Sequence, residues 1–430
     1  MKSFFKNIIV AIISFEARLV LKKYRPRIVA VVGSVGKTTT KDAIYAVLKT
    51  AYFVRKSDKS FNSDVGVPLT ILGCENAWTN PLLWIKNIFD GLILIALQNR
   101  YPEWLVLEVG ADHPGDIRNI ASWIATDIVV MTRLPDVPVH VEYFDSPEAV
   151  IEEKASIISS LKEGGILVLN GDDKNIRDLM EKHADKRIIT FGARKENDVH
   201  AMRYAVISRD KTPQGIRFHV RYEENEAPVN IHGSLGRGHL YPVLAASAVG
   251  IAEKIPFADI ANAFETYDGP SGRMRLISGM NKTTLIDDTY NSSPIAVLEA
   301  LHLLEQTNVP GRKIVVLGDM MELGRYSVEE HKRIGKRVAE TANMLATVGF
   351  RARGFADGAK EGGMKAGNIL QFDTAEQAGG KLQKVAQEGD LVLLKASQSI
   401  RLEKAVKMLM AEPERAPELL VRQDREWSYR

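Results

Sequence analysis

The sequence predicts an α/β protein built from two consecutive, mostly parallel sheets. Short apolar runs bounded by glycine or aspartate recur along the chain, and stretches with helical spacing lie between them. Such runs are typical of parallel strands that are buried on both faces. The run Gly269-Pro270-Ser271-Gly272 separates two series of these strands. At 430 residues, the chain is long enough for two or three domains.

The charge balance and the composition exclude several classes of protein. Lys and Arg number 57 and Asp and Glu number 54, a formal charge of +3, which is too balanced for a nucleic-acid binder that works by counterion release. Apolar residues make up 45% and charged residues 26%, which excludes a disordered chain and a polytopic membrane protein. The single cysteine, Cys74, excludes an internal disulfide and a zinc site with several thiolates, and we expect a reducing compartment.

The N-terminal segment 1–25 predicts an uncleaved helix that is apolar on a broad face and basic at its ends. The uncharged apolar run from Ile8 to Phe15 stops at Glu16, short of the roughly 20 residues that span a bilayer. No small-residue cleavage site follows, and the next residues include Lys22 and Lys23. Two interpretations remain open: a helix packed on the first domain, or a helix that lies on a membrane surface.

The first series of apolar runs is expected to form the parallel strands 28–32, 104–109, 127–132 and 165–170. Residues 199–233 instead alternate polar and apolar side chains around the segment Thr212-Pro213-Gln214-Gly215. This alternation predicts an antiparallel patch with a turn at that segment.

The segment 84–97 predicts a helix with one broad apolar face. Its members are Trp84, Ile85, Ile88, Phe89, Leu92, Ile93 and Ala96. We expect this face to pack in the core. Contact with a membrane surface, together with the N-terminal helix, is the alternative.

The second series predicts a further α/β domain. Its expected strands are 283–288, 313–319, 344–349 and 390–396. We therefore expect three parts along the chain: an apolar and basic helix in residues 1–26, a central parallel-sheet domain in 27–270, and a C-terminal Rossmann-like α/β domain in 271–430.

The strongest local motif is Gly33-Ser34-Val35-Gly36-Lys37-Thr38-Thr39, which follows a predicted strand and opens a predicted helix. This is the context of a phosphate-binding loop. The glycines let backbone N–H groups approach phosphate oxygens, and the helix N-terminus adds a positive dipole. Lys37 is placed to neutralise the β- and γ-phosphates, and the Thr38 hydroxyl to ligate Mg²⁺. The motif predicts ATP or GTP, but not the reaction.

Three further residues are candidates by their positions. Glu108 ends a predicted strand, at the edge where ligands of parallel sheets bind, and is placed to hold Mg²⁺ beside the loop. His140 follows another strand and is either a ligand or a structural histidine. Lys154 lies on a helix that begins at Ser146 and Pro147, and its composition alone makes it an ordinary exposed lysine.

Taken together and in order, these motifs resemble the Mur ligases, a family of ATP-dependent enzymes that form amide bonds. The resemblance runs from about residue 28 to 410 and is strongest to the MurF type, which adds D-alanyl-D-alanine to UDP-N-acetylmuramoyl-tripeptide. The matching segments are GSVGKTT at 33–39, FNSDVGVPLTIL at 61–72, VLEVGADHPGDI at 106–117, HVEYFDSPEAVIEEKASI at 140–157, SGRM at 271–274, DDTYNSSP at 287–294, VLGDMMELG at 316–324 and LLKASQSIRLEKAV at 393–406.

The resemblance implies a role for each matching residue. The residues implied to bind ATP are Gly33, Ser34, Val35, Gly36, Lys37, Thr38, Thr39, Arg273, Asp288 and Asn291. Those implied to hold Mg²⁺ are Thr38, Glu108, His140 and Lys154, the last as a carbamate. Those implied to contact the substrates are Asn62, Ser63, Asp64, Lys395 and Ser397.

The implied reaction joins a carboxylate to an amine, with ATP and Mg²⁺ as cofactors. A peptide-precursor carboxylate attacks the γ-phosphate to give an acyl phosphate, and the amine of an amino acid or dipeptide then attacks the carbonyl. Both steps build negative charge on oxygen, which Mg²⁺, Lys37 and Arg273 would stabilise. Because Arg273 belongs to the second domain, the site would be complete only when the domains close.

Two departures from the family pattern bear on substrate recognition. The phosphate loop starts at residue 33, so we expect the chain to lack the N-terminal domain with which relatives bind UDP-sugars. The family's Lys-Gly-Ser-Arg is replaced by Lys395-Ala396-Ser397-Gln398, which removes a bidentate contact from arginine to a substrate carboxylate.

The leading hypothesis is a cytoplasmic, monomeric ligase that adds D-Ala-D-Ala to a muramoyl-peptide precursor in peptidoglycan synthesis, with no nucleic-acid partner. Residues 1–25 and 84–97 are the candidates for peripheral contact with the inner face of a membrane. Two alternatives stay open. One is a ligase of the same fold with a lipid-linked or poly-amino-acid acceptor. The other is a phosphate-loop NTPase that acts as a regulatory module without an amine substrate.

Overall fold

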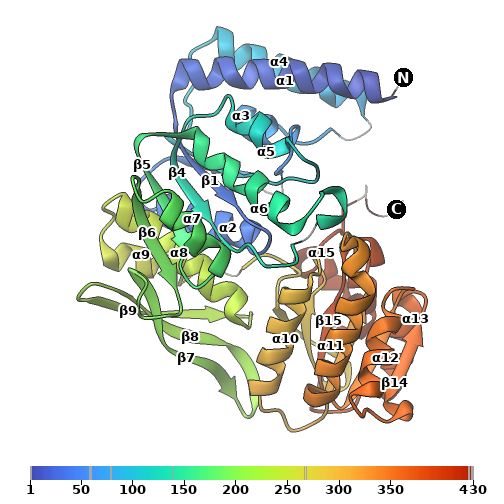
Figure 1. Cartoon of the computed structure of the whole chain (residues 1–430). Coiled ribbons are helices and arrows are strands. Elements are labelled where there is room, and N and C mark those ends of the chain that lie inside the picture. The colour runs from blue at the N-terminus through green and yellow to red at the C-terminus, as the bar shows by residue number, and fades with distance from the viewer. Residues whose placement is uncertain are drawn as a thin grey trace.

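The computed structural model describes residues 2–57, 61–77, 80–138, 140–265, 267, 269–424 and 427, with side chains from residue 8 onward. Its architecture is two α/β units, one around a large sheet and one around a small sheet (Figure 1). We call them the large-sheet half and the small-sheet half. The strands of the large sheet precede those of the small sheet in the chain, as the sequence predicts.

The large sheet has nine strands among the described residues, in the order β2-β3-β1-β4-β5-β6-β7-β8-β9. Neighbours from β2 to β7 pair in parallel, and β7, β8 and β9 pair antiparallel. The strands are β1 (Arg27–Val32), β2 (Val54–Lys56), β3 (Trp104–Glu108), β4 (Thr126–Met131), β5 (Leu161–Asn170), β6 (Arg187–Gly192), β7 (Val199–Arg209), β8 (Thr212–Tyr222) and β9 (Asn225–His232). Because β1 lies between β3 and β4, the carboxyl ends of these three strands meet at one edge.

The small sheet has six strands in the described part of the chain, in the order β10-β11-β15-β12-β13-β14. Only the edge strand β10 is antiparallel to its neighbour. The strands are β10 (Arg275–Ser278), β11 (Thr284–Asp288), β12 (Lys313–Gly318), β13 (Met344–Val348), β14 (Ile369–Phe372) and β15 (Leu391–Lys395). The parallel core of this sheet is the Rossmann-like pattern that the second series of runs predicts.

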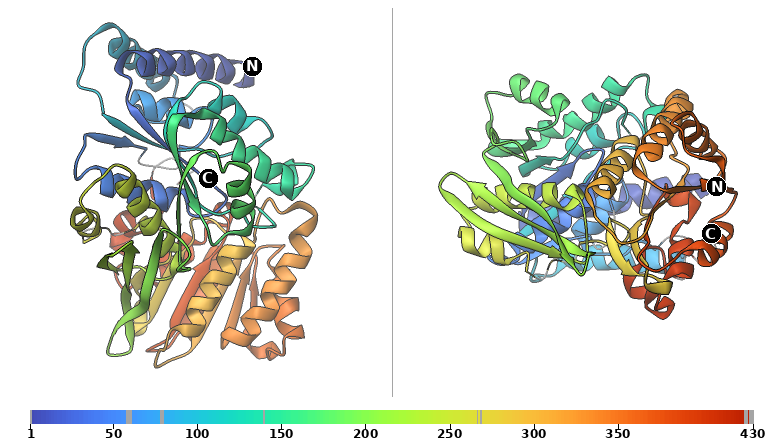
Figure 2. Two further views of the ribbon diagram at one scale, coloured as in Figure 1. Left: turned by 60° about the vertical axis from the view of Figure 1, so that its left-hand side comes forward. Right: turned by 90° about the horizontal axis from the view of Figure 1, so that it is seen from below.

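The α-helices pack around the two sheets (Figures 1 and 2). Those of the large-sheet half are α1 (Lys2–Tyr24), α2 (Lys37–Leu48), α3 (Gly66–Leu72), α4 (Pro81–Ala96), α5 (Asp116–Ala121), α6 (Pro147–Ala155), α7 (Lys174–Lys182), α8 (Arg237–Ala252) and α9 (Phe257–Asn262). Those of the small-sheet half are α10 (Pro294–Gln306), α11 (Ser327–Thr341), α12 (Arg353–Glu361), α13 (Ala375–Val385), α14 (Glu403–Leu409) and α15 (Ala416–Leu419).

The side chains of β1 alternate between two buried clusters, one on each face of the large sheet. Val29 and Val31 belong to the cluster that contains α2 and α8, and Ile28 and Ala30 to the cluster that contains α1, α3 and α5. The first cluster continues into α10 and α11 of the small-sheet half. The two halves therefore share an apolar contact, which holds them together at the junction where β1 and β3 end.

The strands expected from apolar runs are confirmed, since each predicted run overlaps an observed strand. The antiparallel patch at 199–233 is also confirmed, but the turn predicted at 212–215 is wrong. Those residues lie in β8, and the chain reverses at Asp210 and Lys211, where φ is 48° and 62°. A two-residue loop with positive φ at both positions matches the right-handed twist of paired strands.

The expectation that the apolar face of α4 packs in the core is wrong for most of that face. Its exposed members are Ile85, Phe89, Leu92, Ile93 and Ala96. Trp84 and Ile88 are half-buried, and the buried side of the helix carries Asn87 and Gly91. Gly91 lets α1 approach so closely that a Cβ there would lie 2.4 Å from Glu16 Oε2. The helix is apolar on nearly every side, so close approach at a small residue decides which side is buried.

The N-terminal helix packs on the large-sheet half, as the first of the two interpretations predicts. Its buried residues include Ile13, Ala17 and Val20. Lys23 Nζ donates to the carbonyl oxygens of Leu94 and Ile95, at 2.9 and 3.1 Å, and so caps the C-terminal end of α4. The side chains of Lys2 and Lys6, the basic residues at the N-terminal end of this helix, precede the part of the chain whose side chains are described. Among the described residues, no helix combines the length and the apolar character that crossing a membrane requires.

The contact between α1 and α4 predicts a pH-dependent stability. Burial raises the pKa of Glu16 to about 7, from 4.5, and Glu16 Oε2 is buried with no hydrogen-bond partner among the described residues. The folded state therefore holds a proton that the unfolded chain releases between pH 4.5 and 7, so Glu16 lowers the free energy of unfolding as the pH rises through that range. In the wild type we expect this loss of stability to be on the order of 1–3 kcal/mol, and we expect Glu16→Gln to abolish it.

Chemical denaturation of both proteins at several pH values measures this difference. The matched control is Glu163→Gln, because Glu163 is exposed. Equal pH slopes for the wild type and Glu16→Gln would show that the Glu16 carboxyl does not titrate with folding.

Candidate functional site

The phosphate loop lies between the end of β1 and the start of α2, as the motif predicts. Gly33 has φ 147° and lies so close to β4 that a Cβ there would lie 2.1 Å from Thr132 Oγ1. Thr132 Oγ1 donates to the carbonyl oxygen of Val35 at 2.7 Å. Gly36, the N-cap of α2, has φ 84°, which favours glycine. The close approach at Gly33 and the left-handed conformation of Gly36 thus set the path of the loop from β1 to the start of α2.

Two polar groups of the loop are placed for an anion. Lys37 Nζ donates to the carbonyl oxygen of Gly33 at 3.0 Å, so its ammonium folds back over the loop. The Ser34 hydroxyl is buried and has no hydrogen-bond partner in the described part of the chain, and a phosphate oxygen would supply one. Burial lowers the pKa of the Lys37 ammonium. The carboxylates of Glu108 and Asp112 oppose this shift, and the Arg273 guanidinium adds to it.

A pair of hard oxygen donors stands beside the loop. Thr38 Oγ1 donates to Glu108 Oε1 at 3.2 Å, and Glu108 is only 1% exposed. Asn62 Nδ2 also donates to Glu108 Oε1, at 3.4 Å, and Asn62 O accepts from Gly110 N. A hydroxyl and a carboxylate are donors that Mg²⁺ prefers, so these residues fit a metal ion that bridges to a bound phosphate. The strand order explains why Glu108 lies beside the loop: Glu108 in β3 is the register partner of Val31 in β1, just before the loop begins.

Lys154 lies in α6, which begins with the Ser146 hydroxyl accepting from Ala149 N. Its side chain is 1% exposed, although its helix gives no sequence signal for burial. Burial lowers the pKa of Lys154 to about 7, and the charge of Lys37 adds to this shift, while Asp112 and Glu153 oppose it. A substantial fraction of Lys154 is therefore a neutral amine at neutral pH, which is the nucleophilic form of lysine.

His140 bridges the two halves. Its Nδ1 lies 2.8 Å from Glu322 Oε2, and its Nε2 lies 3.7 Å from Asp112 Oδ1. His140 is in the left-handed conformation, with φ 71°, directly before the 3₁₀ turn η1 (Val141–Tyr143). Glu322 comes from the small-sheet half, just before the turn η4 (Gly324–Tyr326), and its pKa is lowered by the contact with His140. A carboxylate from one half thus reaches an imidazole of the other.

The small-sheet half also supplies Arg273, whose guanidinium carbon lies 4.0 Å from the centre of the Tyr290 ring. The carbonyl oxygen of Arg273 accepts from His239 Nε2 at 2.8 Å. Lys395 Nζ lies 2.6 Å from Asp288 Oδ2, in a buried ion pair, and also donates to the carbonyl oxygen of Asn291 at 3.0 Å.

Arg273, His239, Asp288 and Lys395 border a cavity at the junction of the two halves. Its lining includes Val35, Gly36 and Thr39 from the loop, and Arg273, Asp288 and Lys395 from the small-sheet half. The cavity therefore joins the phosphate loop to the side chains that the sequence places near the nucleoside.

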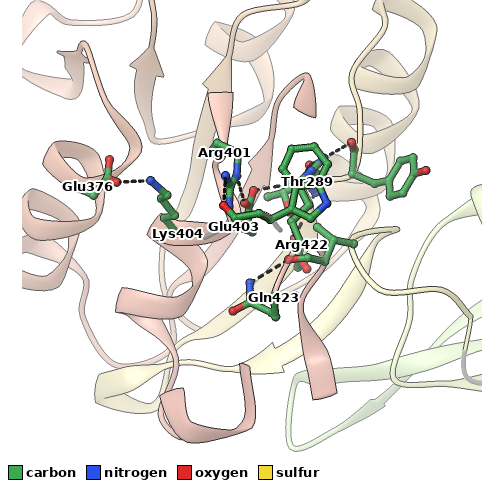
Figure 3. Close-up of polar contacts among 11 residues, drawn as sticks. Thr289, Glu376, Arg401, Glu403, Lys404, Arg422 and Gln423 are labelled. Carbon is green, nitrogen blue, oxygen red and sulfur yellow. Dashed lines mark hydrogen bonds and ion pairs between the residues drawn. The ribbon is translucent and has the colours of Figure 1, made fainter. Parts of the chain in front are cut away.

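A buried arginine network supports the segment that carries Tyr290 (Figure 3). Arg422 donates to the carbonyl oxygens of Thr289 and Tyr290 and lies 3.0 Å from Glu403 Oε2. Glu403 is fully buried and also pairs with Arg401, at 2.6 Å. Because the Tyr290 ring stacks on Arg273, the C-terminal segment holds in place the arginine that faces the phosphate loop.

Comparisons with known proteins agree with this geometry. The Mur ligase middle domain model matches residues 91–250, and the model of the Mur ligase, glutamate ligase domain matches residues 272–398. The UDP-N-acetylmuramoyl-tripeptide–D-alanyl-D-alanine ligase of Bacillus subtilis is 30% identical over 399 residues, which cover 92% of this chain and 79% of that enzyme. The chain belongs to the Mur ligase family.

Solved structures show the same fold. The MurF ligase of Thermotoga maritima, solved in complex with ADP, has a TM-score of 0.75 and 25% identity, covering 94% of this chain and 84% of its own. MurF from Acinetobacter baumannii has a TM-score of 0.75 and 22% identity, covering 93% and 79%. Mur ligases form amide bonds with ATP, and this chain is an ATP-dependent ligase of that family, with ATP and Mg²⁺ as cofactors.

The structure brings some of the expected site residues together and leaves others apart. Lys37, Thr38, Glu108, Lys154 and Arg273 lie within electrostatic or hydrogen-bond reach of at least one other member of the set. Asn62 joins them through its hydrogen bond to Glu108, and Lys395 contacts Asp288 and Asn291.

Ser63 and Asp64 are exposed, and the Ser63 hydroxyl accepts from Gly66 N at the start of α3. Ser397 accepts from Met321 N within the small-sheet half. The Thr39 carbonyl oxygen accepts from Tyr267.

Sequence reasoning assigned no role to Asp112, Glu322 or Arg422. Asp112 and Glu322 follow β3 and β12 closely, so the rule that ligands bind at the carboxyl ends of parallel strands marks both as candidates. Arg422 lies 149 residues after Arg273 in the chain (422 − 273), and no local pattern connects the two.

The buried arginine network predicts a large effect of Arg422→Ala on stability. The substitution leaves the Glu403 carboxylate buried with one partner fewer, and we expect a loss of about 3 kcal/mol in the free energy of unfolding. The matched control is Arg415→Ala, since Arg415 pairs with Glu412 and Glu418 on the surface and should change stability little. Urea denaturation of both variants measures the difference, and equal losses would mean that burial does not strengthen the Arg422 contacts.

Proposed function

We propose that the protein joins D-alanyl-D-alanine to the peptide carboxylate of a muramoyl-peptide precursor in peptidoglycan synthesis. The observation that carries this proposal is the convergence of Lys37, Lys154 and Arg273 beside Glu108 at the junction of the halves. The likeness to enzymes named UDP-N-acetylmuramoyl-tripeptide–D-alanyl-D-alanine ligase supports the choice of substrates. A regulatory NTPase without an amine substrate would give Glu108, His140 and Lys154 no shared role.

The reaction would begin with transfer of the γ-phosphoryl group of ATP to the precursor carboxylate, which gives an acyl phosphate and ADP. The amine of D-Ala-D-Ala would then attack the acyl carbon, and phosphate would leave from the tetrahedral intermediate. Lys37, over the loop, and Arg273, from the other half, would stabilise the charge that develops on the phosphoryl oxygens. Arg273 can do so only while the halves are closed, so closure would be coupled to chemistry.

The metal-binding residues of the proposal are Thr38, Glu108, His140 and Lys154. Mg²⁺ bound there would neutralise phosphate charge and polarise the transferred group. Thr38 and Glu108 offer oxygen donors directly. The neutral amine of Lys154, favoured by a pKa of about 7, would react with CO₂ to form a carbamate, which adds a carboxylate to the donor set. Formation of the carbamate would also remove a positive charge next to Lys37.

The substrates would lie on opposite sides of the junction. Asn62, through its contact with Glu108, marks the side of the precursor, and Ser63 and Asp64 follow it at the surface. Lys395 and Ser397 would mark the side of the amine, and Asp288 and Asn291 the side of the nucleoside. The parts 1–26, 27–270 and 271–430 are proposed as the functional division, in which the last two move relative to each other.

The proposal places the enzyme in the cytoplasm, where ATP and nucleotide-linked precursors are available, as a monomer at the inner face of the membrane. Residues 1–25 and 84–97 are the segments proposed to face the membrane. Their apolar side chains on the surface support this placement.

The purified chain tests the proposal when it is given ATP, Mg²⁺, UDP-muramoyl-tripeptide and D-Ala-D-Ala, with phosphate release and product mass recorded. We expect a product heavier by the dipeptide, formed with one phosphate released per bond. Lys37→Ala should lose nearly all of this activity, because the half-buried ammonium of Lys37 contacts the loop. If product forms only with a lipid-linked precursor, the acceptor substrate belongs to that class instead. ATP hydrolysis at a rate that depends on neither substrate and is unchanged in Lys37→Ala would refute ligation.

Lys154→Ala tests the carbamate. We expect a loss of at least about 100-fold in kcat, because an acidic metal ligand is lost, and partial recovery on addition of short carboxylic acids. Lys182→Ala, on the exposed surface of α7, is the matched control and should keep full activity. A Lys154→Ala enzyme that is inactive but does not respond to added carboxylic acids would argue against a carbamate at this position.

A further inference from the structure

Exposed apolar side chains gather on α1 and α4. Within the part of the chain whose side chains are described, fourteen large apolar residues are exposed, and ten of them belong to these two helices or to Leu97, the C-cap of α4. On α1 they are Ile8, Ile12 and Phe15. On α4 the most exposed is Leu82, at 73%, and Phe89 follows at 60%. Isolated apolar residues on a surface are ordinary, but ten on two helices that pack against each other indicate a binding surface.

The outer face of α4 is not needed to hold the helix in place. Its opposite side carries Asn87, which donates to the carbonyl oxygen of Glu75, and Gly91, which contacts Glu16 of α1. Tyr24 of α1 donates to a carbonyl oxygen at the C-terminal end of α4. Polar and close-packed contacts therefore fix the helix from inside, while the outer side chains remain available to a partner.

The two helices form the outermost layer at one end of the molecule (Figures 1 and 2). α1 packs on both α3 and α4. The small-sheet half lies at the other end, so a partner that covers α1 and α4 would leave the junction of the halves open (Figure 1).

Basic side chains accompany this apolar surface. Arg18 and Lys22 are exposed on α1, one and two turns after Phe15. Lys86 is exposed on α4 and pairs with Asp90. Apolar side chains flanked by Lys and Arg are the pattern of helices that lie in the interface of a membrane with anionic lipids.

We propose that the outer face of α1 and α4 docks on an anionic phospholipid surface, with its apolar side chains inserted among the lipids and Arg18 and Lys22 against the headgroups. A second copy of the chain is a poorer occupant, because the interface would gather the basic residues of both copies without an added acidic partner. An anionic bilayer neutralises them. The inference deepens the membrane placement proposed above, and ligation does not enter it.

Flotation of the full chain with vesicles tests the docking. The vesicles contain phosphatidylcholine alone or mixed with phosphatidylglycerol. We expect the wild type to float with the mixed vesicles and far less with phosphatidylcholine alone. The variant Leu82→Gln/Phe89→Gln/Ile93→Gln should bind the mixed vesicles at least about tenfold more weakly than the wild type, because three inserted side chains lose their apolar contact with the lipids. Arg18→Gln/Lys22→Gln should lose mainly the preference for phosphatidylglycerol.

The matched control is Val328→Gln/Phe350→Gln, two apolar residues of the small-sheet half that are each 78% exposed. It should float like the wild type. ATP turnover with both substrates, measured in solution without vesicles, should be equal in all of these proteins, because none of the substituted residues borders the cavity. A failure of ligation and a failure of docking are thereby separated.

Three results would overturn the inference. The wild type could remain in the dense fraction with the mixed vesicles. The control variant could lose as much binding as the α4 variant. In sedimentation equilibrium, the wild type could be a dimer that the α4 variant converts to a monomer, without vesicle binding by either, which would assign the surface to a second copy.

Discussion

Three basic side chains, Lys37, Lys154 and Arg273, lie near one another at the junction of the two halves, and the proposed chemistry depends on this constraint. Lys154 is buried, whereas Lys37 and Arg273 are half-buried. Burial lowers the pKa of both lysines, and each also feels a neighbouring cation: Arg273 acts on Lys37, and Lys37 acts on Lys154. In the protein alone such a cluster is unfavourable, because the carboxylates of Glu108 and Asp112 balance only part of the charge. In the proposed reaction, phosphate groups and an activated carboxylate would supply the missing negative charge, so the site would be electrostatically complete only with its substrates.

The fold brings these charges together by strand order rather than by sequence proximity. Parallel pairing of β1 with β3 places Glu108 beside the loop, and the close contact of Gly33 with Thr132 fixes the loop against β4. The second half contributes Arg273, held against Tyr290, and Glu322, held against His140. Each half therefore carries part of the site, and the shared apolar contact between them sets how the parts meet.

The sequence predicts the loop, Glu108 and the two-sheet order well, because each depends on a local signal: a glycine pattern, a strand end, or an apolar run. It does not predict the burial of Lys154. The sequence of α6 is typical of an exposed helix, and the burial comes from neighbouring elements that are distant in the chain. The sequence also misassigns the outer face of α4, since a helix that is apolar on nearly every side leaves the choice of buried face to Gly91 and its contact with α1. The support of Tyr290 by Arg422 is a contact across 132 positions of the chain, beyond any local pattern.

The most direct test of the central claim is a crystal structure of the full chain with Mg²⁺ and a non-hydrolysable analogue of ATP. We expect the terminal phosphate to lie between Lys37 Nζ and the Arg273 guanidinium, within hydrogen-bond distance of both, and the metal to contact Thr38 and Glu108. A nucleotide bound away from the loop, or a terminal phosphate beyond the reach of Arg273 in the closed molecule, would contradict the assignment of these charges to one catalytic centre.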